Sequence, residues 1–344
     1  MQELLGRLRA LDPTASQSLR VIACFDELMT GGVGSRGLLS AAAALAGRPV
    51  SLRRDGRLTR IDTRGHELTD PGPGGATVTV GADTAVWIDD DGTGVHANDA
   101  LILERLALAL RIRDDDAAPT RRDLAVIFDA EAPLADRLDA ASRRGLSPTR
   151  RYRAVAAPLF ATWRVHPTGP EDVQTTAHGP VHAAIIEADA PVDATPLGIG
   201  TAAAPEDLWL SLRTAVIALR LHGPHGLDGG DGPSHADDLG GLAEVLASLP
   251  SRTRADSDGD ALDAVMRHPW GASTVDALVR TSSVREAARA AGIHHSTMST
   301  RVDTVIAELG FDPLDGLGRT RLGLAFLIWR LRTSRVLELP APSS

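Results

Sequence analysis

The sequence predicts a multidomain α+β protein in which two mixed α/β blocks are followed by an all-helical block. At 344 residues the chain is longer than a single hydrophobic core usually grows, so two or three domains are expected. Apolar residues make up 43% of the chain, enough to fill several cores. Strand-like segments are found up to about residue 200, and only helical patterns follow residue 260.

The first block, residues 1–116, is expected to be α/β. A helical pattern runs from Leu19 to Ala46 and ends at Gly47-Arg48-Pro49. Short strands are predicted at 50–52, 77–80 and 84–88, and Asp89-Asp90-Asp91-Gly92 is interpreted as a turn. A leucine-rich helix around residues 101–110 closes the block, and Asp114-Asp115-Asp116 with Pro119 forms a predicted linker.

The second block, residues 120–250, is also expected to be α/β. A helix is predicted over Leu124–Arg144, stopping at Gly145, and strands over Tyr152–Ala157 and Val181–Ile186. The run Leu197-Gly-Ile-Gly200 precedes a helix from Pro205 to Leu221. A loop rich in Gly, Asp and His follows at 222–240, then a helix at 242–249. The last block, residues 260–339, is expected to be helical throughout.

The most specific pattern lies between Ser283 and Leu309 and predicts a helix-turn-helix. Ser283 and Glu286 form a Ser-x-x-Glu capping box, which predicts the start of a helix. Ala288 is small where a second helix crosses closely, and Gly292 follows where the turn favours a positive φ. The second helix is predicted to begin near His295 or Ser296, with its apolar residues spaced four, three and four apart at Met298, Val302, Val305 and Leu309.

Short polar side chains on the opposite face of this second helix suit a helix whose N-terminal half lies in a DNA major groove. We expect double-stranded DNA to be contacted by Arg285, Arg289, His294, His295, Ser296, Thr297, Ser299, Thr300 and Arg301. The three arginines are candidates for phosphate contacts, which position a protein without specifying sequence. Arg301 held by an acidic neighbour is the structural alternative. An αα-hairpin inside a regulatory domain is the alternative for the whole motif.

Charge and cysteine content limit the function classes. The net charge of −9 argues against a protein that coats nucleic acid along its whole length. Between Trp270 and Arg335, however, nine arginines and six acidic residues give +3, and the rest of the chain carries −12. Cys24 is the only cysteine, which excludes an intramolecular disulfide, and no signal peptide or membrane span is visible. We therefore expect a cytoplasmic protein with a basic C-terminal module.

The C-terminal block resembles the helix-turn-helix domain of the PucR/CdaR family of bacterial transcriptional regulators. The resemblance is carried by Ala287-Ala-Arg-Ala-Ala-Gly-Ile-His-His-Ser-Thr-Met-Ser-Thr-Arg-Val302, then Ile306–Pro313 and Arg321–Leu327. In that family a histidine, a polar pair ending in threonine and an arginine follow the turn, and His294, Ser296-Thr297 and Arg301 match them. Ser296 stands where asparagine is common, and Met298-Ser299-Thr300 replaces a more typical Val-x-Tyr, which bears on the bases read.

The resemblance extends upstream. Arg144-Gly-Leu, Tyr152-Arg-Ala-Val-Ala and Leu197-Gly-Ile-Gly200 are similar to the family's central domain, a relative of the nucleotide-cyclase fold that usually lacks catalytic residues. The first block is similar to a GAF-like sensor domain of actinobacterial members, most visibly at Ala41–Val50. The resemblance thus implies a GAF-like domain, a degenerate cyclase-like domain and a helix-turn-helix domain.

Enzymatic chemistry is not expected from this sequence. The only string near a diguanylate-cyclase turn, Leu227-Asp-Gly-Gly-Asp-Gly-Pro233, follows the helix that closes the central domain and is interpreted as linker. Histidines and aspartates in the same loop raise a metal site as an alternative, but glycine-rich spacing offers no rigid scaffold. Cys24 on an apolar helix face favours a buried structural thiol over a redox sensor. We predict no catalytic residue, metal or cofactor.

The favoured hypothesis is a DNA-binding transcriptional regulator, a homodimer or homotetramer, that couples a signal such as an unidentified small-molecule effector to promoter binding. The alternative is a regulator whose C-terminal helices bind a protein partner. An enzyme acting on a small molecule is the third and weakest hypothesis. Steep weakening of binding by salt would distinguish DNA from a protein partner.

Overall fold

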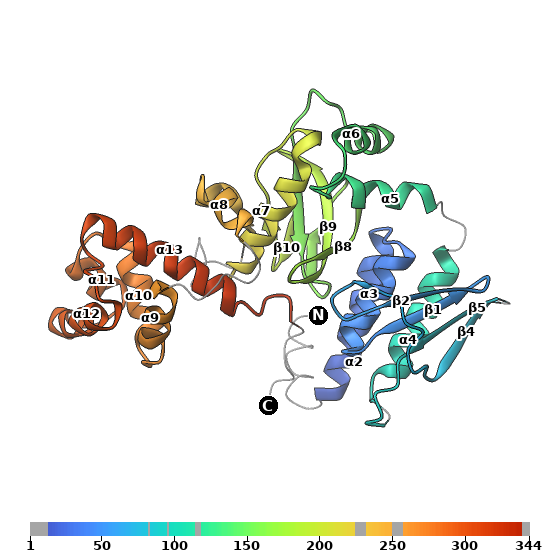
Figure 1. Cartoon of the computed structure of the whole chain (residues 1–344), viewed down its shortest axis with the longest axis horizontal. Coiled ribbons are helices and arrows are strands. Elements are labelled where there is room, and N and C mark those ends of the chain that lie inside the picture. The colour runs from blue at the N-terminus through green and yellow to red at the C-terminus, as the bar shows by residue number, and fades with distance from the viewer. Residues whose placement is uncertain are drawn as a thin grey trace. The chain divides into compact units, whose positions relative to one another are not determined.

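The computed structural model describes residues 13–81, 83–94, 96–113, 118–223, 232–249 and 257–338. The chain divides into two compact units (Figure 1). Unit 1 comprises Met1–His222, Gly230–Ala247 and Val336–Ser344, and unit 2 comprises Gly223–Gly229 and Ser248–Arg335. Helices and strands are mixed in unit 1, and unit 2 is helical in its described part, so the α+β class is confirmed.

The N-terminal part of unit 1 is an antiparallel sheet with helices packed on one face (Figure 1). Its strands are ordered β3-β2-β1-β5-β4. They span Val50–Arg54 (β1), Arg57–Ile61 (β2), Glu67–Leu68 (β3), Thr77–Gly81 (β4) and Thr84–Ile88 (β5). The helices are α2 (Pro13–Thr30), α3 (Ser35–Ala46) and α4 (Asp99–Arg113). Phe25, Leu28, Leu39, Leu106 and Leu110 fill the space between helices and sheet.

Buried ion pairs fix one end of this sheet. Asp89, directly after β5, is 3% exposed and accepts a hydrogen bond of 2.7 Å from Nε of Arg60 on β2, which is also buried. The Arg48 guanidinium donates to the Asp89 carbonyl at 3.0 Å and to the Asp99 carboxylate at 2.5 Å, which ties the sheet to α4. The first residue of the predicted turn is therefore a buried ion-pair partner, a role that the turn-like composition of residues 89–92 conceals.

The central part of unit 1 has a second five-stranded sheet, ordered β12-β11-β6-β9-β8. Its strands are β6 (Tyr152–Ala157), β8 (Glu171–Thr176), β9 (Gly179–Glu187), β11 (Gly198–Ile199) and β12 (Ser234–His235). Helix α7 (Leu208–Arg220), preceded by the 3-10 turn η1 (Pro205–Asp207), packs on one face. A two-stranded ribbon of β7 (Thr162–Val165) and β10 (Asp193–Thr195) lies at the other face. Helices α5 (Ala118–Ile127), α6 (Leu134–Arg143) and α8 (Leu242–Ser248) and the 3-10 turn η2 (Ala236–Leu239) complete this part.

Strand periodicity explains the two-sided burial of this sheet. On β6, Ala154 and Ala156 face α7, whereas Val155 and Ala157 face the core beside the β7–β10 ribbon. Gly198 on β11 permits close approach, because a Cβ there would lie 2.1 Å from the carbonyl oxygen of Ala215 on α7.

The N-terminal and central parts of unit 1 share contacts through β8. The buried Asp172 carboxylate accepts hydrogen bonds from the backbone N–H of Gly34, at 3.0 Å, and of Val173, at 2.8 Å. The Thr175 hydroxyl donates to the Gly65 carbonyl at 2.9 Å. Val173 itself belongs to the N-terminal hydrophobic core. The predicted boundary between residues 116 and 120 thus separates two sheets that pack as one compact unit.

Unit 2 contains five described helices: α9 (Ser257–Met266), α10 (Gly271–Arg280), α11 (Val284–Ala290), α12 (His295–Leu309) and α13 (Gly316–Thr333). Their apolar faces form one core that includes Leu262, Val275, Met298, Val305 and Phe326. Ion pairs from Arg321 to Asp258 and from Arg332 to Asp263 join α13 to α9.

Several sequence predictions need correction. The helix expected over Leu19–Ala46 is two helices, because the chain turns between Thr30 and Ser35, a glycine-rich stretch with Gly32 at φ 73°. The helix expected over Leu124–Arg144 is likewise divided, with Pro133 at the N-cap of α6. The sequence did not predict strands β2 (Arg57–Ile61), β3, β7, β8, β10, β11 and β12. The linker Asp114-Asp115-Asp116 lies outside the described residues, and Pro119 lies within α5.

Within the described ranges, no helix combines the length and the apolar character that a membrane crossing requires. No group of histidine, cysteine and acidic residues in these ranges is arranged to hold a metal ion. The loop for which a metal site is the alternative interpretation is only partly described, since residues 224–231 fall outside these ranges. Its first histidine, His222, forms a 3.1 Å hydrogen bond with the hydroxyl of Ser234.

Candidate nucleic-acid interface

The first helix of the predicted motif, α11, begins at the expected cap. The Ser283 hydroxyl accepts a 3.3 Å hydrogen bond from the backbone N–H of Glu286. The Glu286 carboxylate reaches back and accepts from the backbone N–H of Ser282, at 2.9 Å, and from the Ser282 hydroxyl, at 2.6 Å. These bonds lower the pKa of the Glu286 carboxyl and hold it ionised. The cap is confirmed, with the glutamate bonded one residue earlier than in the standard capping box.

The turn between α11 and α12 has the backbone geometry that the sequence predicts. Gly292 has φ 66°, a conformation that costs energy for residues with a side chain. Ile293 N–H donates to the Ala288 carbonyl at 2.9 Å, which closes the turn on α11. Ala288 is 3% exposed, so the small residue lies in the packed region of the motif.

Helix α12 buries the predicted face. Met298, Val302, Val305 and Leu309 are all buried, at the predicted spacing. His294 is the N-cap, and its Nδ1 accepts a 3.3 Å hydrogen bond from the backbone N–H of Ser296. His294 therefore stabilises the N-terminal end of α12, the end that would enter a major groove. Its Nδ1 is occupied by the cap hydrogen bond.

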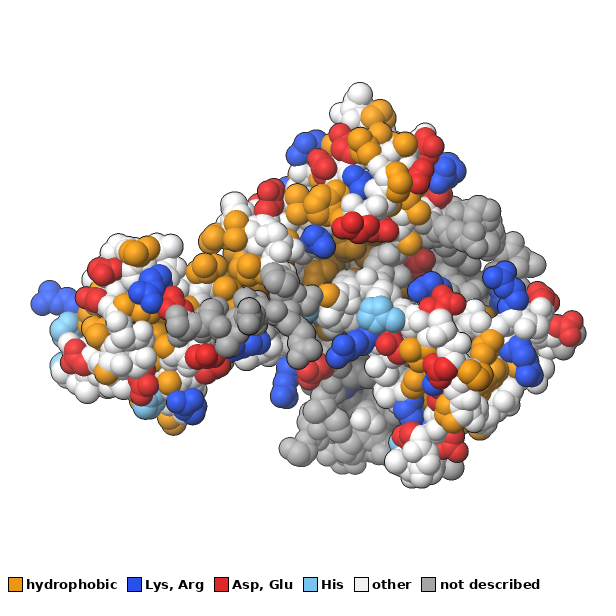
Figure 2. All heavy atoms as spheres, in the orientation of Figure 1, with side chains coloured by type: hydrophobic (Ala, Val, Ile, Leu, Met, Phe, Trp, Pro, Cys, Tyr) orange, Lys and Arg blue, Asp and Glu red, His pale blue; other side chains and the backbone are white. Residues whose placement is uncertain are grey.

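The predicted contact residues share one region of unit 2. Seven are exposed, namely Arg285, Arg289, His294, His295, Ser296, Thr297 and Thr300, and Ser299 and Arg301 are half-buried. Figure 2 shows acidic and basic side chains interspersed over the visible face of the helical unit. Which basic groups are available therefore depends on their individual partners.

Ion pairing separates the arginines of unit 2 into two groups. Arg280, Arg321 and Arg332 each pair with an aspartate. Arg319 donates to the carbonyl oxygens of Thr281 and Ser282, at 2.6 and 3.1 Å. Among the described residues, no carboxylate forms an ion pair with any of the three arginines predicted to contact DNA, Arg285, Arg289 and Arg301.

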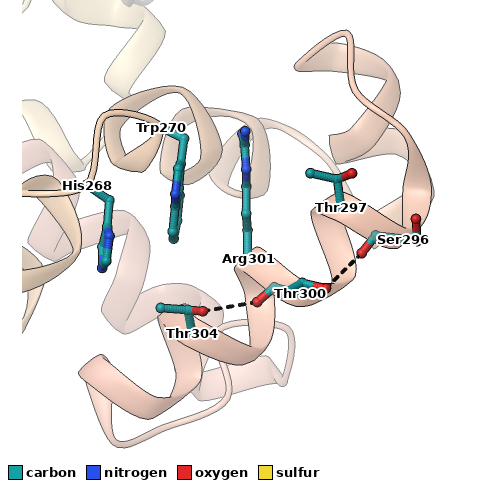
Figure 3. Close-up of a pocket in the computed structure, with 7 residues that line it drawn as sticks. All are labelled: His268, Trp270, Ser296, Thr297, Thr300, Arg301 and Thr304. Atoms are coloured by element: carbon teal, nitrogen blue, oxygen red, sulfur yellow. Dashed lines mark hydrogen bonds between the residues drawn. The ribbon is translucent and has the colours of Figure 1, made fainter.

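A pocket of about 600 Å³ opens beside α12 (Figure 3). Its lining residues come from α12 and from the segment between α9 and α10: His268, Trp270, Ser296, Thr297, Thr300, Arg301 and Thr304. The Thr300 and Thr304 hydroxyls donate to the backbone carbonyls one turn earlier, at 3.2 and 3.1 Å. With these protons engaged, both oxygens can accept a hydrogen bond from a ligand.

Arg301 is held by an aromatic ring and a hydroxyl. Its guanidinium carbon lies 5.3 Å from the centre of the Trp270 ring, and its Nη1 donates to the buried Thr274 hydroxyl at 3.3 Å. The Trp270 ring stacks on His268, with centroids 4.6 Å apart and planes 12° apart. Among the described residues, no acidic side chain forms a hydrogen bond or ion pair with Arg301, so the acidic neighbour considered from the sequence is not found there. Sequence reasoning missed His268, Trp270 and Thr304, and the only available signal was a tryptophan at the start of the basic stretch.

Cys24, in unit 1, is buried, as the sequence predicts for a structural thiol. The thiol is buried among apolar residues in the N-terminal core, and burial raises its pKa to about 12. A thiol with so high a pKa is a poor nucleophile and a poor redox sensor at neutral pH.

Two helices joined by a glycine turn, a packed apolar face and an opposing polar face define a helix-turn-helix domain of the DNA-binding class. Residues 272–328 match the model of the PucR C-terminal helix-turn-helix domain, so the C-terminal domain belongs to that family. The resemblance found in the sequence is confirmed for this part of the chain.

Comparison with solved structures finds similarity to a regulator of polyketide synthase expression from Bifidobacterium adolescentis. The identity is 14% and the TM-score 0.26, over 63% of this chain and 100% of that chain. A TM-score this low gives no basis for transferring fold or function. No curated protein matches the chain.

Proposed function

We propose that the protein is a transcriptional regulator that binds double-stranded DNA through α12 and its flanking arginines. The observation that carries this proposal is the exposed polar face of α12 inside a PucR-type domain. Next to it lie arginines that form no ion pair with a carboxylate among the described residues. The N-terminal half of α12 would lie in the major groove, with Ser296, Thr297 and Thr300 at base edges. Arg285 and Arg289, both on α11, would contact phosphates.

The protein would act as a homodimer or homotetramer. A single helix-turn-helix reads too few base pairs for useful selectivity, and dimers of such domains bind half-sites about 10 base pairs apart. In this proposal the N-terminal part of unit 1 is a GAF-like domain that senses a small-molecule effector, and the central part is a degenerate cyclase-like domain without catalysis. The mixed architecture of unit 1, with helices packed on one antiparallel and one mixed sheet, supports both assignments at the level of fold class.

The test is selection of genomic DNA fragments by the purified full-length protein, followed by affinity measurements over a salt series. With two to three phosphate contacts per subunit of a dimer, affinity should fall about 10²- to 10³-fold between 50 and 200 mM salt. A Thr297→Ala, Arg301→Ala double variant should lose specific binding. Arg332→Ala is the matched control, because it removes the same charge from a side chain paired with Asp263.

A failure of the wild type to bind any fragment specifically at low salt, with intact helical content, would refute the DNA-binding proposal. Salt-insensitive capture of a protein by the same C-terminal helices would instead favour the protein-partner alternative.

A further inference from the structure

Three planar side-chain groups lie in a row beside α12, in the pocket that its polar residues line. Figure 3 shows the His268 imidazole, the Trp270 indole and the Arg301 guanidinium side by side. The imidazole and indole rings stack with centroids 4.6 Å apart, and the guanidinium carbon lies 5.3 Å from the indole centroid. His268 and Trp270 come from the segment before α10, outside the two helices of the motif.

This arrangement restrains Arg301 in a way that Arg285 and Arg289 are not restrained. A free arginine side chain has high rotamer entropy, which is lost when it binds a partner. The Trp270 ring covers one face of the guanidinium, and the Thr274 hydroxyl accepts one of its five N–H groups. The loss of entropy on binding DNA is therefore smaller for Arg301 than for the two exposed arginines.

The restrained guanidinium also stands among the groups that would read bases. Arg301 lines the same pocket as Ser296, Thr297 and Thr300 of α12. A planar guanidinium recognises two acceptors in one plane, as on the O6/N7 edge of guanine or on two phosphate oxygens. Its place in the pocket lined by the hydroxyls of α12 favours the base edge over the phosphate backbone.

We infer that Arg301 reads a guanine in the major groove, and that Trp270, backed by His268, is the positioning residue that holds its guanidinium for this contact. The inference rests on the proposed DNA-binding function and deepens it by assigning a base specificity. It also extends the interface to the segment before α10, which carries no base contact itself.

The experiment measures affinity, by fluorescence anisotropy, for a selected binding site and for versions with each base pair of one half-site replaced. The wild type should lose about 10- to 100-fold at one G·C pair. Arg301→Ala should remove that discrimination while discrimination at the other pairs persists. Arg301→Lys should not restore it, because an ammonium lacks the planar fork.

The positioning role is tested at the same G·C pair. Trp270→Leu should lose the discrimination that Arg301→Ala loses, whereas Trp270→Phe, which keeps an aromatic face, should retain most of it. Because Trp270 also packs against the core of unit 2, Thr274→Val provides a second variant that removes only the hydroxyl under Arg301. Arg332→Ala again serves as the charge control.

Two results would overturn the inference while leaving DNA binding intact. A uniform loss of affinity in Arg301→Ala, with the salt slope reduced by about one per subunit and restored in Arg301→Lys, would make Arg301 a phosphate contact. Unchanged base discrimination in both Trp270→Leu and Thr274→Val would remove the positioning role. Absence of specific binding by the wild type would instead refute the proposed function, and the inference with it.

Discussion

The buried ion pair between Arg60 and Asp89 makes a sharp prediction about the stability of unit 1. Both residues are less than a tenth exposed, and the Asp89 carboxylate accepts from Nε of Arg60 at 2.7 Å and pairs with its Nη2 at 2.5 Å. In Asp89→Ala the guanidinium of Arg60 stays buried without its main counter-charge. Removing one partner of a buried pair costs about 3–5 kcal/mol, much of it from the charge that remains.

A second partner of Arg60, Asp70, places the expected cost of Asp89→Ala at the lower end of the range of about 3–5 kcal/mol. Asp70 also pairs with Arg60, but its side chain is 64% exposed, so water already screens that interaction. We expect Asp89→Ala to cost about 3 kcal/mol, a large share of the roughly 5–15 kcal/mol by which domains are stable. For a unit of this size the melting temperature should fall by about 6–12 °C.

Calorimetry and urea unfolding of the full-length protein measure this effect. Asp70→Ala is the matched control and should cost less than about 1 kcal/mol. The double variant Arg60→Met, Asp89→Leu should recover most of the lost stability, because apolar replacement of a whole buried pair is often neutral. Equal, small losses in Asp89→Ala and Asp70→Ala would show that Arg60 remains solvated, which would refute the reasoning.

Three further predictions concern unit 1. Gly198→Ala should destabilise it by about 3 kcal/mol in urea unfolding, because the new Cβ would lie 2.1 Å from the Ala215 carbonyl oxygen; Gly241→Ala, with open space around it, should be near neutral. Burial and Arg220 lower the pKa of His178 to about 4, so the unfolded state takes up the proton first and stability should fall from pH 6.5 to 4. Screening by solvent at this partly exposed ring limits the loss of stability to about 1 kcal/mol. Urea unfolding of His178→Gln across the same pH range should not show this loss. Cys24, with its pKa raised to about 12, should react with Ellman's reagent only on unfolding; rapid reaction in the native state would contradict its burial.

The helix-turn-helix was predictable because its constraints are local. A cap at Ser283, a positive φ at Gly292 and a buried stripe from Met298 to Leu309 each follow from a residue type and a spacing. None depends on residues distant in the sequence. The same holds for β6 and β9, whose long apolar runs identify buried strands.

The missed strands have the opposite character. On β8, Glu171–Thr176, the buried positions include Asp172 and Gln174, so burial does not appear as apolar periodicity. Asp172 is tolerated there because its carboxylate accepts from the backbone N–H of Gly34, 138 residues earlier in the chain. A buried acid in such a strand looks like loop composition until its distant donor is known.

The difference between local signals and contacts with distant residues also applies to Arg301. From the sequence, an arginine on a recognition helix has two local explanations, a phosphate contact or an acidic neighbour within one or two turns. Its actual support comes from Trp270, 31 positions earlier, through a face-on contact that no helical spacing encodes. An acidic neighbour would have neutralised the guanidinium charge, whereas the indole face restrains the group and leaves its charge available. The structure therefore keeps Arg301 both fixed and cationic, the two properties that recognition of a base edge in DNA requires.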